Sequence, residues 1–333
     1  MKPKHPRLLF YSLGHFWVDF SCALLMFSRL SGQRDWTLCI LFYNFCAFAL
    51  QMPIGLLADR RDRAGRTAAL GCLLVTLGWL LSPAPPAAAV TAGIGNACFH
   101  IGGGVQTLRD GGDRAAPLGV FVSPGAFGIF FGTLLGGRSA FPGWFAAAGL
   151  LLFALIFLRL DSRTDLSPAI APPDRNTLWV LACCFLVVVL RSYLGMILAF
   201  PWKTGGWALV IVCGTVLGKA AGGFLGDRLG MLRASVLSLG LSAVLFCLSG
   251  FPLAGTAAVL LFNMTMPITL WAAARLLPGR RGFAFGGLTF ALFLGFLPVW
   301  LGWPVPLTGG AGYAAGAVCS LVILVLGLKR GRL

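Results

Sequence analysis

Apolar stretches of about 20 residues recur along the whole chain, separated by short segments rich in charge, proline or glycine. A helix needs about 20 consecutive apolar residues to cross the hydrocarbon core of a membrane. The pattern therefore predicts about twelve membrane-spanning helices, at 8–28, 36–57, 67–82, 88–108, 115–136, 142–160, 177–198, 206–225, 234–251, 254–274, 282–300 and 309–328. The third and ninth are short, which leaves ten or eleven true spans as alternatives.

The composition agrees with an all-α polytopic membrane protein. Of 333 residues, 58% are hydrophobic and 11% are charged, which is unlike a soluble domain. The first apolar segment follows basic residues as a signal peptide would. It is too long for one, contains Asp19 and has no evident cleavage site, so we expect a retained membrane helix.

The basic residues fall mainly in alternate loops. Twenty of the 26 Lys and Arg residues lie in seven segments that share one side of the membrane. The positive-inside rule makes this side the cytoplasm and places both termini there. Because the net charge of +16 is spread over short segments, it favours anionic lipid headgroups over nucleic acid as partners. We expect a monomer in the lipid bilayer of a bacterial cytoplasmic (inner) membrane.

Two loops repeat a short pattern, which reads "GLLADRRDRAGRT" at 55 to 67 and "GGFLGDRLGMLRAS" at 222 to 235. Both resemble the signature Gly-x-x-x-Asp-Arg-x-Gly-Arg of the major facilitator superfamily. The second copy matches it at Gly223, Asp227, Arg228 and Gly230. The first copy keeps Gly55, Asp59 and Arg60, but its later glycine, Gly65, is displaced as though two or three residues were inserted.

This resemblance implies a fold and a function. The fold is two six-helix bundles, 1–160 and 177–333, joined by a cytoplasmic linker at 161–176. The function is secondary transport of a small molecule by alternating access, so we expect no enzymatic activity, no cofactor and no resident metal. The resemblance also implies that each Asp-Arg loop is a latch, in which the aspartate caps a helix N-terminus and pairs with an arginine. A solvated loop is the alternative. Because the first copy is distorted, we expect Asp59 to matter less than Asp227.

Glycines at every fourth position form ridges on the fifth and eighth predicted spans, and small residues at this spacing let membrane helices approach closely. These ridges are Gly128, Gly132 and Gly136, and Gly214, Gly218 and Gly222. The resemblance implies that the two ridges face each other across the bundles and permit rocking. Static packing is the alternative.

Polar residues in the first and fourth spans are candidates for the transport site. Asp19 and Asn96 lie roughly 17–18 Å from the cytoplasmic ends of their helices, and His15 and His100 roughly 10–12 Å. His15 and Asp19 are four residues apart, as are Asn96 and His100, and each of these two pairs hence lies on one helix face. The resemblance places both helices at a central cavity. Since histidine titrates near neutral pH, the group could carry a proton. A polar network that fixes helix packing is the alternative.

Two cations fall within predicted spans. Arg191 lies roughly 20 Å from the cytoplasmic face and needs a partner there, which could be Asp19 or an anionic substrate group. Lys219 is close enough to the cytoplasmic face to extend its ammonium group into water.

A narrower resemblance concerns the transport class. "GHFWVDF" at 14 to 20 and "GNACFHIGGG" at 95 to 104 are similar to the fosmidomycin-resistance exporters, and "PGAFGIFFGTLLGG" at 124 to 137 resembles the fifth helix of antiporters, with Thr133 in place of a proline. These motifs favour a proton-coupled exporter. A divalent metal transporter using His15, Asp19 and His100, and a non-transporting receptor or assembly factor, remain alternatives. The chain has no Walker-type loop that would make ATP the direct energy source.

Overall fold

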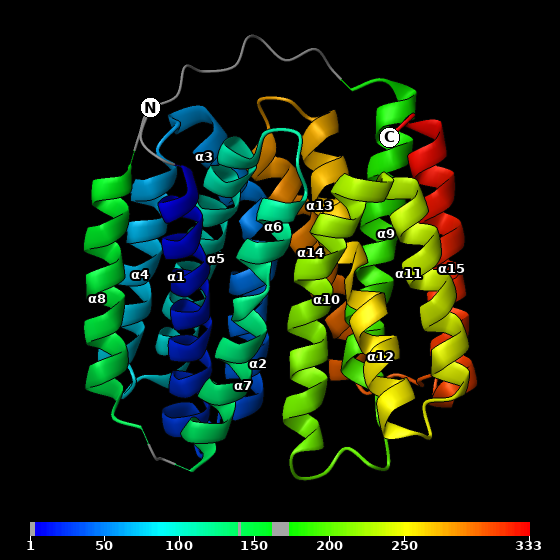
Figure 1. The fold of residues 1–333 in the computed structure, drawn as a ribbon. Helices are drawn as coiled ribbons and strands as arrows, with labels where there is room; N and C mark the ends of the chain where they lie inside the picture. Colours follow the sequence, from blue (N-terminus) through cyan, green and yellow to red (C-terminus); the bar gives the residue numbers. More distant parts are fainter. Residues whose placement is uncertain (1–3, 139–140, 162–172) are drawn as a thin grey trace. The chain divides into compact units, whose positions relative to one another are not determined.

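The computed structural model describes residues 4–138, 141–161 and 173–333, and every regular element in these ranges is a helix (Figure 1). Most of the predicted linker at 161–176 lies outside the described residues. A helical segment is present at each of the twelve predicted spans, so the predicted fold class is confirmed.

In the first half of the chain, three of the six spans are built from more than one helical piece. The segments are α1 (Lys4–Leu25) with the π-helical turn η1 (Met26–Leu30); α2 (Trp36–Asn44), η2 (Phe45–Ala49) and α3 (Gln51–Arg61); α4 (Ala64–Leu80); α5 (Pro85–Gly111); α6 (Ala116–Val122) with α7 (Pro124–Gly137); and α8 (Gly143–Leu160). Pro124 begins α7 because proline has no N–H to continue the hydrogen bonding of α6.

In the second half, only the tenth span is divided. The segments are α9 (Arg175–Ile197), α10 (Trp207–Leu229), α11 (Met231–Cys247), α12 (Pro252–Asn263) with α13 (Thr265–Leu276), α14 (Arg281–Trp300) and α15 (Gly309–Arg330). Asp174 precedes α9 and accepts a hydrogen bond of 2.7 Å from the N–H of Thr177. Hydrogen bonding from Thr177 lowers the pKa of this carboxyl.

Among the described residues, nine helical segments are long and apolar enough to cross a membrane. The helices α4 and α11 are apolar but have only 17 residues each, in agreement with the short third and ninth predicted spans. The helix α5 is long but less apolar, since it carries Asn96, His100 and Gln106.

The chain folds into two compact units. Unit 1 comprises Met1–Asp110, Pro124–Pro168 and Gly279–Gly287, and unit 2 comprises Gly111–Ser123, Ala169–Pro278 and Leu288–Leu333. The division differs from the predicted bundles in two segments, because α6 belongs to unit 2 and the start of α14 belongs to unit 1. Each of these segments continues into a helix of the other unit.

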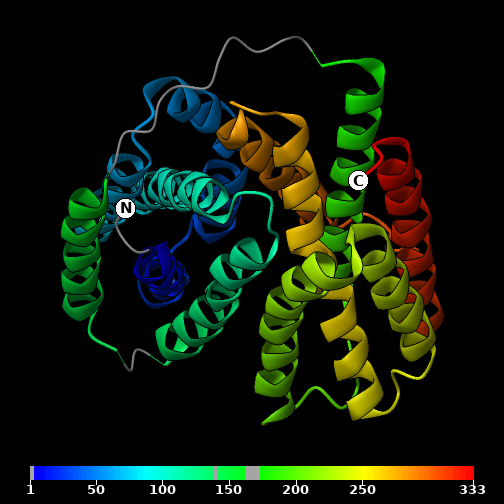
Figure 2. The same ribbon diagram turned by 45° about the horizontal axis from the view of Figure 1, so that its top comes forward.

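In unit 1, α1 lies in the middle of the helices and is packed against α4, α7 and α8 (Figure 2). The glycine ridge of α7 faces α1. A Cβ atom at Gly128 would lie 2.3 Å from the carbonyl oxygen of Phe16, and one at Gly132 would lie 2.4 Å from that of Phe20. Gly136 continues the contact beside Phe27. The two backbones therefore touch along this ridge.

In unit 2, the ridge of α10 faces the divided tenth span. A Cβ at Gly218 would lie 2.1 Å from the carbonyl oxygen of Leu260, one at Gly222 would lie 2.0 Å from that of Met264, and Gly214 lies beside Thr256. Each ridge is thus covered by a helix of its own unit. The expectation that the two ridges face each other is wrong.

The fifth and eighth spans nevertheless contact each other within unit 2, through different glycines. A Cβ at Gly119 of α6 would lie 2.6 Å from the carbonyl oxygen of Lys219, and one at Gly223 of α10 would lie 2.7 Å from that of Ala115. Gly119 belongs to no ridge at four-residue spacing in the sequence, so sequence analysis missed it.

Candidate functional site

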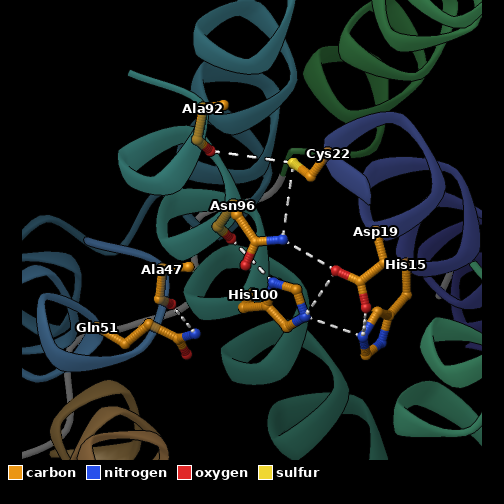
Figure 3. A network of polar contacts seen from close by, with 8 residues as sticks. All are labelled: His15, Asp19, Cys22, Ala47, Gln51, Ala92, Asn96 and His100. Atoms are coloured by element: carbon orange, nitrogen blue, oxygen red, sulfur yellow. Dashed lines mark hydrogen bonds and ion pairs between the residues drawn. The ribbon is translucent and has the colours of Figure 1, made fainter. Parts of the chain in front are cut away.

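Four of the five predicted transport-site residues form one buried cluster between α1 and α5 in unit 1 (Figure 3). The Asp19 carboxylate is its centre, with 7% of the residue exposed. Asn96 donates a hydrogen bond of 2.9 Å from Nδ2 to Asp19 Oδ1. His15 Nε2 lies 3.2 Å from Asp19 Oδ2, and His100 Nε2 lies 3.7 Å from Asp19 Oδ1.

The two histidines also contact each other, with their Nε2 atoms 2.9 Å apart. His100 Nδ1 lies 2.9 Å from the carbonyl oxygen of Asn96. Because a carbonyl only accepts, Nδ1 of His100 carries the hydrogen of this bond. In a neutral His100, Nε2 then has no hydrogen, so the hydrogen between the two rings comes from His15.

The helix α7 closes the cluster with a glycine. A Cβ atom at Gly125 would lie 2.3 Å from His15 Nε2 and 2.5 Å from Asp19 Oδ2. Glycine is therefore needed for the backbone of α7 to approach these polar atoms. Sequence analysis missed this role, although Gly125 stands one turn before the predicted ridge.

The same three titratable side chains could hold a metal ion. One ligand atom from each of His15, Asp19 and His100 lies within 4.8 Å of the others, and all three residues are buried. Imidazole nitrogen and carboxylate oxygen are ligands that divalent transition metals accept.

Two other polar side chains of this region donate hydrogen bonds to backbone carbonyl oxygens. Gln51, which in Figure 3 lies on the opposite side of His100 from Asp19, donates to the carbonyl oxygen of Ala47 at 2.6 Å. Trp17 donates from Nε1 to the carbonyl oxygen of Ala146 at 3.0 Å, so its indole packs against α8.

The two cations of the predicted spans, Arg191 and Lys219, belong to unit 2, whereas the cluster belongs to unit 1. Arg191 is 8% exposed and stands on the buried face of α9. Lys219 is half-buried on α10, near the cytoplasmic end predicted from the sequence.

The aspartates of the repeated loops cap two helices. Asp227 accepts hydrogen bonds of 2.7 and 3.0 Å from the N–H groups of Ala115 and Ala116, at the start of α6. Asp59 accepts bonds of 2.8 and 2.9 Å from those of Gly282 and Phe283, at the start of α14. A helix N-terminus favours a negative charge because its first N–H groups are unpaired. The two copies therefore make equivalent contacts. The distortion of the first copy thus gives no reason to expect a smaller role for Asp59 than for Asp227.

Glycines in these loops let the capped helices approach. A Cβ at Gly55 would lie 2.1 Å from the carbonyl oxygen of Gly282, and one at Gly223 would lie 2.7 Å from Cα of Ala116 at the start of α6. Arg60 and Arg228 are exposed. Gly230 ends α10 with φ of 87°, a conformation that favours glycine.

The first loop is less distorted than its sequence suggests. Asp62 stands at the position of Gly230, three residues after the capping aspartate, and adopts a left-handed conformation with φ of 47°. Aspartate tolerates this region better than most residues. Two residues, Asp62 and Arg63, separate α3 from α4, whereas Gly230 alone separates α10 from α11. The insertion is therefore one residue, not two or three.

The additional charges of the first loop form ion pairs that sequence analysis missed. Asp62 pairs with Arg109 of α5 at 2.5 Å. Asp161, at the end of α8, lies 3.2 Å from Arg63 and 3.3 Å from Arg66. Its carboxylate also accepts from the N–H of Gly65 at 3.1 Å. The loop is thus tied to two helices of unit 1.

Solved structures share this arrangement of helices over almost the whole chain. The fucose:proton symporter FucP of E. coli matches with a TM-score of 0.68 and 14% identity, over 98% of each chain. The human organic anion transporter MFSD10 (TETRAN) matches with a TM-score of 0.68 and 16% identity, over 98% of this chain and 100% of that one.

A bacterial homologue of the iron transporter ferroportin, in its outward-facing state, matches with a TM-score of 0.63 and 16% identity, over 98% of this chain and 100% of that one. The chain has the major facilitator fold. No protein-family model matches the sequence, and a search of curated proteins finds no match. At these identities the likeness concerns the fold, and the major facilitator fold supports many different substrates.

Proposed function

We propose that the chain is a secondary active transporter that moves a small organic solute across the membrane by alternating access, and that His15, Asp19 and His100 carry the coupling proton. The observation that carries this proposal is the buried cluster of one carboxylate and two imidazoles. The major facilitator fold supports it, since the proteins with similar structures include a proton symporter and an organic anion transporter.

The physical reason lies in the cost of charge inside a membrane. An ionised carboxylate within the hydrocarbon region is unfavourable by a few kcal/mol or more unless it is paired or hydrated. Here Asn96 and the two histidines stabilise Asp19. A proton that enters the cluster raises the net charge of these three contacting side chains by one. Such a change alters the affinity for a substrate bound beside them, which is the coupling that transport requires.

For the direction of transport, we propose proton-driven efflux. The motifs "GHFWVDF" and "GNACFHIGGG" resemble the fosmidomycin-resistance exporters, and both contribute residues to the cluster. The protein would act as a monomer in a bacterial inner membrane, with both termini in the cytoplasm as the positive-inside rule predicts. The two bundles, 1–160 and 177–333, would move relative to each other, and the Asp59 and Asp227 caps would stabilise one of the alternating states.

The test is transport by proteoliposomes under an imposed pH gradient, with a substrate screen on the wild type and then on two variants. Asp19→Asn removes the charge and the titration at nearly constant volume. It should abolish accumulation against a gradient while it retains substrate binding. Asp35→Asn is the matched control, because Asp35 is exposed in a loop. It should transport as the wild type does.

His100→Gln tests the second titrating partner. It should slow transport and shift the pH optimum, because one proton-holding ring is lost. Accumulation by Asp19→Asn at the wild-type level would refute the proposal and leave the cluster as a packing network.

A divalent metal transporter is the second candidate, favoured by the close approach of three ligand atoms. In this case Zn²⁺ or Mn²⁺ would enter liposomes that contain the wild type and not those that contain His15→Gln. Bound Co²⁺ would quench the fluorescence of Trp17, two residues from His15. Solute transport without either effect would exclude this candidate.

A further inference from the structure

Arg191 occupies a place in α9 where an apolar residue is expected. The buried positions of α9 follow helical spacing, and they are Val180, Cys183, Cys184, Val187, Val188, Arg191 and Leu194. All except Arg191 are apolar or thiol side chains. A guanidinium group stays charged at any ordinary pH, so it needs compensation in such a place.

No described carboxylate of unit 2 compensates Arg191. Asp113 pairs with Arg275, and Asp227 caps α6. Asp174 caps the N-terminus of α9 itself, 17 residues before Arg191, which corresponds to about 25 Å along the helix. In unit 1, Asp19 is already bonded by Asn96 and flanked by two histidines.

Neutral hydroxyl groups near α9 cannot supply the missing negative charge, and three of them donate their hydrogens to backbone carbonyl oxygens. The helix α13 packs against α9. Thr265 donates to the carbonyl oxygen of Phe262 in α12, and Thr269 donates to that of Met266 in α13, each at 3.0 Å. Ser192 donates to the carbonyl oxygen of Leu292 at 2.6 Å. Among the described residues, Nη1 of Arg191 is buried without a hydrogen-bond partner. The unit therefore presents a desolvated cation with a free donor.

We propose that Arg191 binds an oxyanion group of the transported solute, either a carboxylate or a phosphonate. The planar guanidinium offers paired N–H donors that match two oxygens of such a group, and the bond is strongest where water is excluded. This inference rests on the proposed transport function and adds the substrate class: a small organic anion. Arg191 supplies the charge that holds the anion, whereas His15, Asp19 and His100 supply the coupling proton.

The experiment measures thermal stability of the purified full chain in detergent, because this readout requires no gradient. The probes are matched pairs at equal concentration: benzoate with benzamide, and phenylphosphonate with its diethyl ester. At least one anion should raise the Tm of the wild type by a few degrees above its neutral partner, since a ligand that binds the folded state stabilises it. This increment should vanish in Arg191→Met and be reduced in Arg191→Lys.

Two further comparisons keep the result decisive. Without any probe, Arg191→Met should be at least as stable as the wild type, because it removes an uncompensated buried charge. Lys219→Met removes the other intramembrane cation of unit 2 and should keep the full response to the anion.

If Arg191→Met has a lower Tm than the wild type and the added substitution Asp19→Asn restores it, the inference is overturned and Arg191 is a structural counter-ion of Asp19. Equal Tm shifts with charged and neutral probes in the wild type would also overturn it. Anion-dependent stabilisation without proton-coupled transport would instead refute the proposed function and leave the anion site standing.

Discussion

Replacing Asp227 with asparagine should destabilise the start of α6, and the two hydrogen bonds of its carboxylate indicate by about how much. The carboxylate accepts two hydrogen bonds, from the N–H groups of Ala115 and Ala116. Asparagine has one acceptor oxygen and no charge, so one bond is lost and the other weakened. Hydrogen bonds to charged groups contribute about 1.5–3 kcal/mol each, and the loss should be about 2–3 kcal/mol. This corresponds to about a 30- to 160-fold increase in the opening equilibrium.

Hydrogen–deuterium exchange measures this opening directly. In Asp227→Asn, the amides at the start of α6 should exchange about 30- to 160-fold faster than in the wild type, because their opening is a local equilibrium. The amides at the start of α14 should be unchanged. Asp59→Asn should give the reverse result with a similar magnitude, since Asp59 makes the equivalent pair of bonds to Gly282 and Phe283.

The control is Asp113→Asn, which removes a carboxylate close in sequence to α6 that is exposed and pairs with Arg275 instead. It should not accelerate exchange in α6. If Asp227→Asn leaves exchange at Ala115 and Ala116 as slow as in the wild type, the carboxylate does not hold this helix. The proposed latch then has no energetic basis, and equal transport rates would follow.

Three further outcomes are expected. Gly128→Ala should lower the Tm, because a Cβ atom 2.3 Å from the carbonyl oxygen of Phe16 would push α7 away from α1 at a cost of about 1–3 kcal/mol. Gly137→Ala is the control and should leave the Tm unchanged, since its Cβ would have no atom within 4 Å. Equal Tm values for the two variants would contradict the packing argument. Gly125→Ala should shift the pH dependence of transport, since it displaces His15 or Asp19; an unchanged profile would separate α7 from the cluster. A reporter fused after residue 170 should be active on the cytoplasmic side, and periplasmic activity would reverse the predicted orientation.

The helices could be predicted from the sequence because each one is specified by a continuous stretch of residues. An apolar run of about 20 residues specifies a span whatever its neighbours are. The pairing of polar residues within a helix is equally local. His15 with Asp19, and Asn96 with His100, are each four residues apart and therefore share a face. Matching depths in antiparallel spans then brought the four residues together correctly.

The partners of the glycines could not be predicted in this way. The spacing of Gly128, Gly132 and Gly136 shows that some helix approaches closely, but it does not say which one. The structure places α1 there. The resemblance had suggested another helix, and the contact between the fifth and eighth spans depends on Gly119 and Gly223 instead. Such choices depend on the packing of the whole unit.

The chain connects the capped helix to the polar cluster by a short path. The start of α6 is held by Asp227, and α6 continues through Ser123 directly into α7. At the first turn of α7, the backbone at Gly125 lies against His15 and Asp19. Because only Ser123 separates α6 from α7, we expect a displacement of α6 that breaks its cap to shift the backbone at Gly125 as well. Protonation of Asp19 and release of the cap at Asp227 would then bias one and the same movement, and each should therefore alter the other's equilibrium.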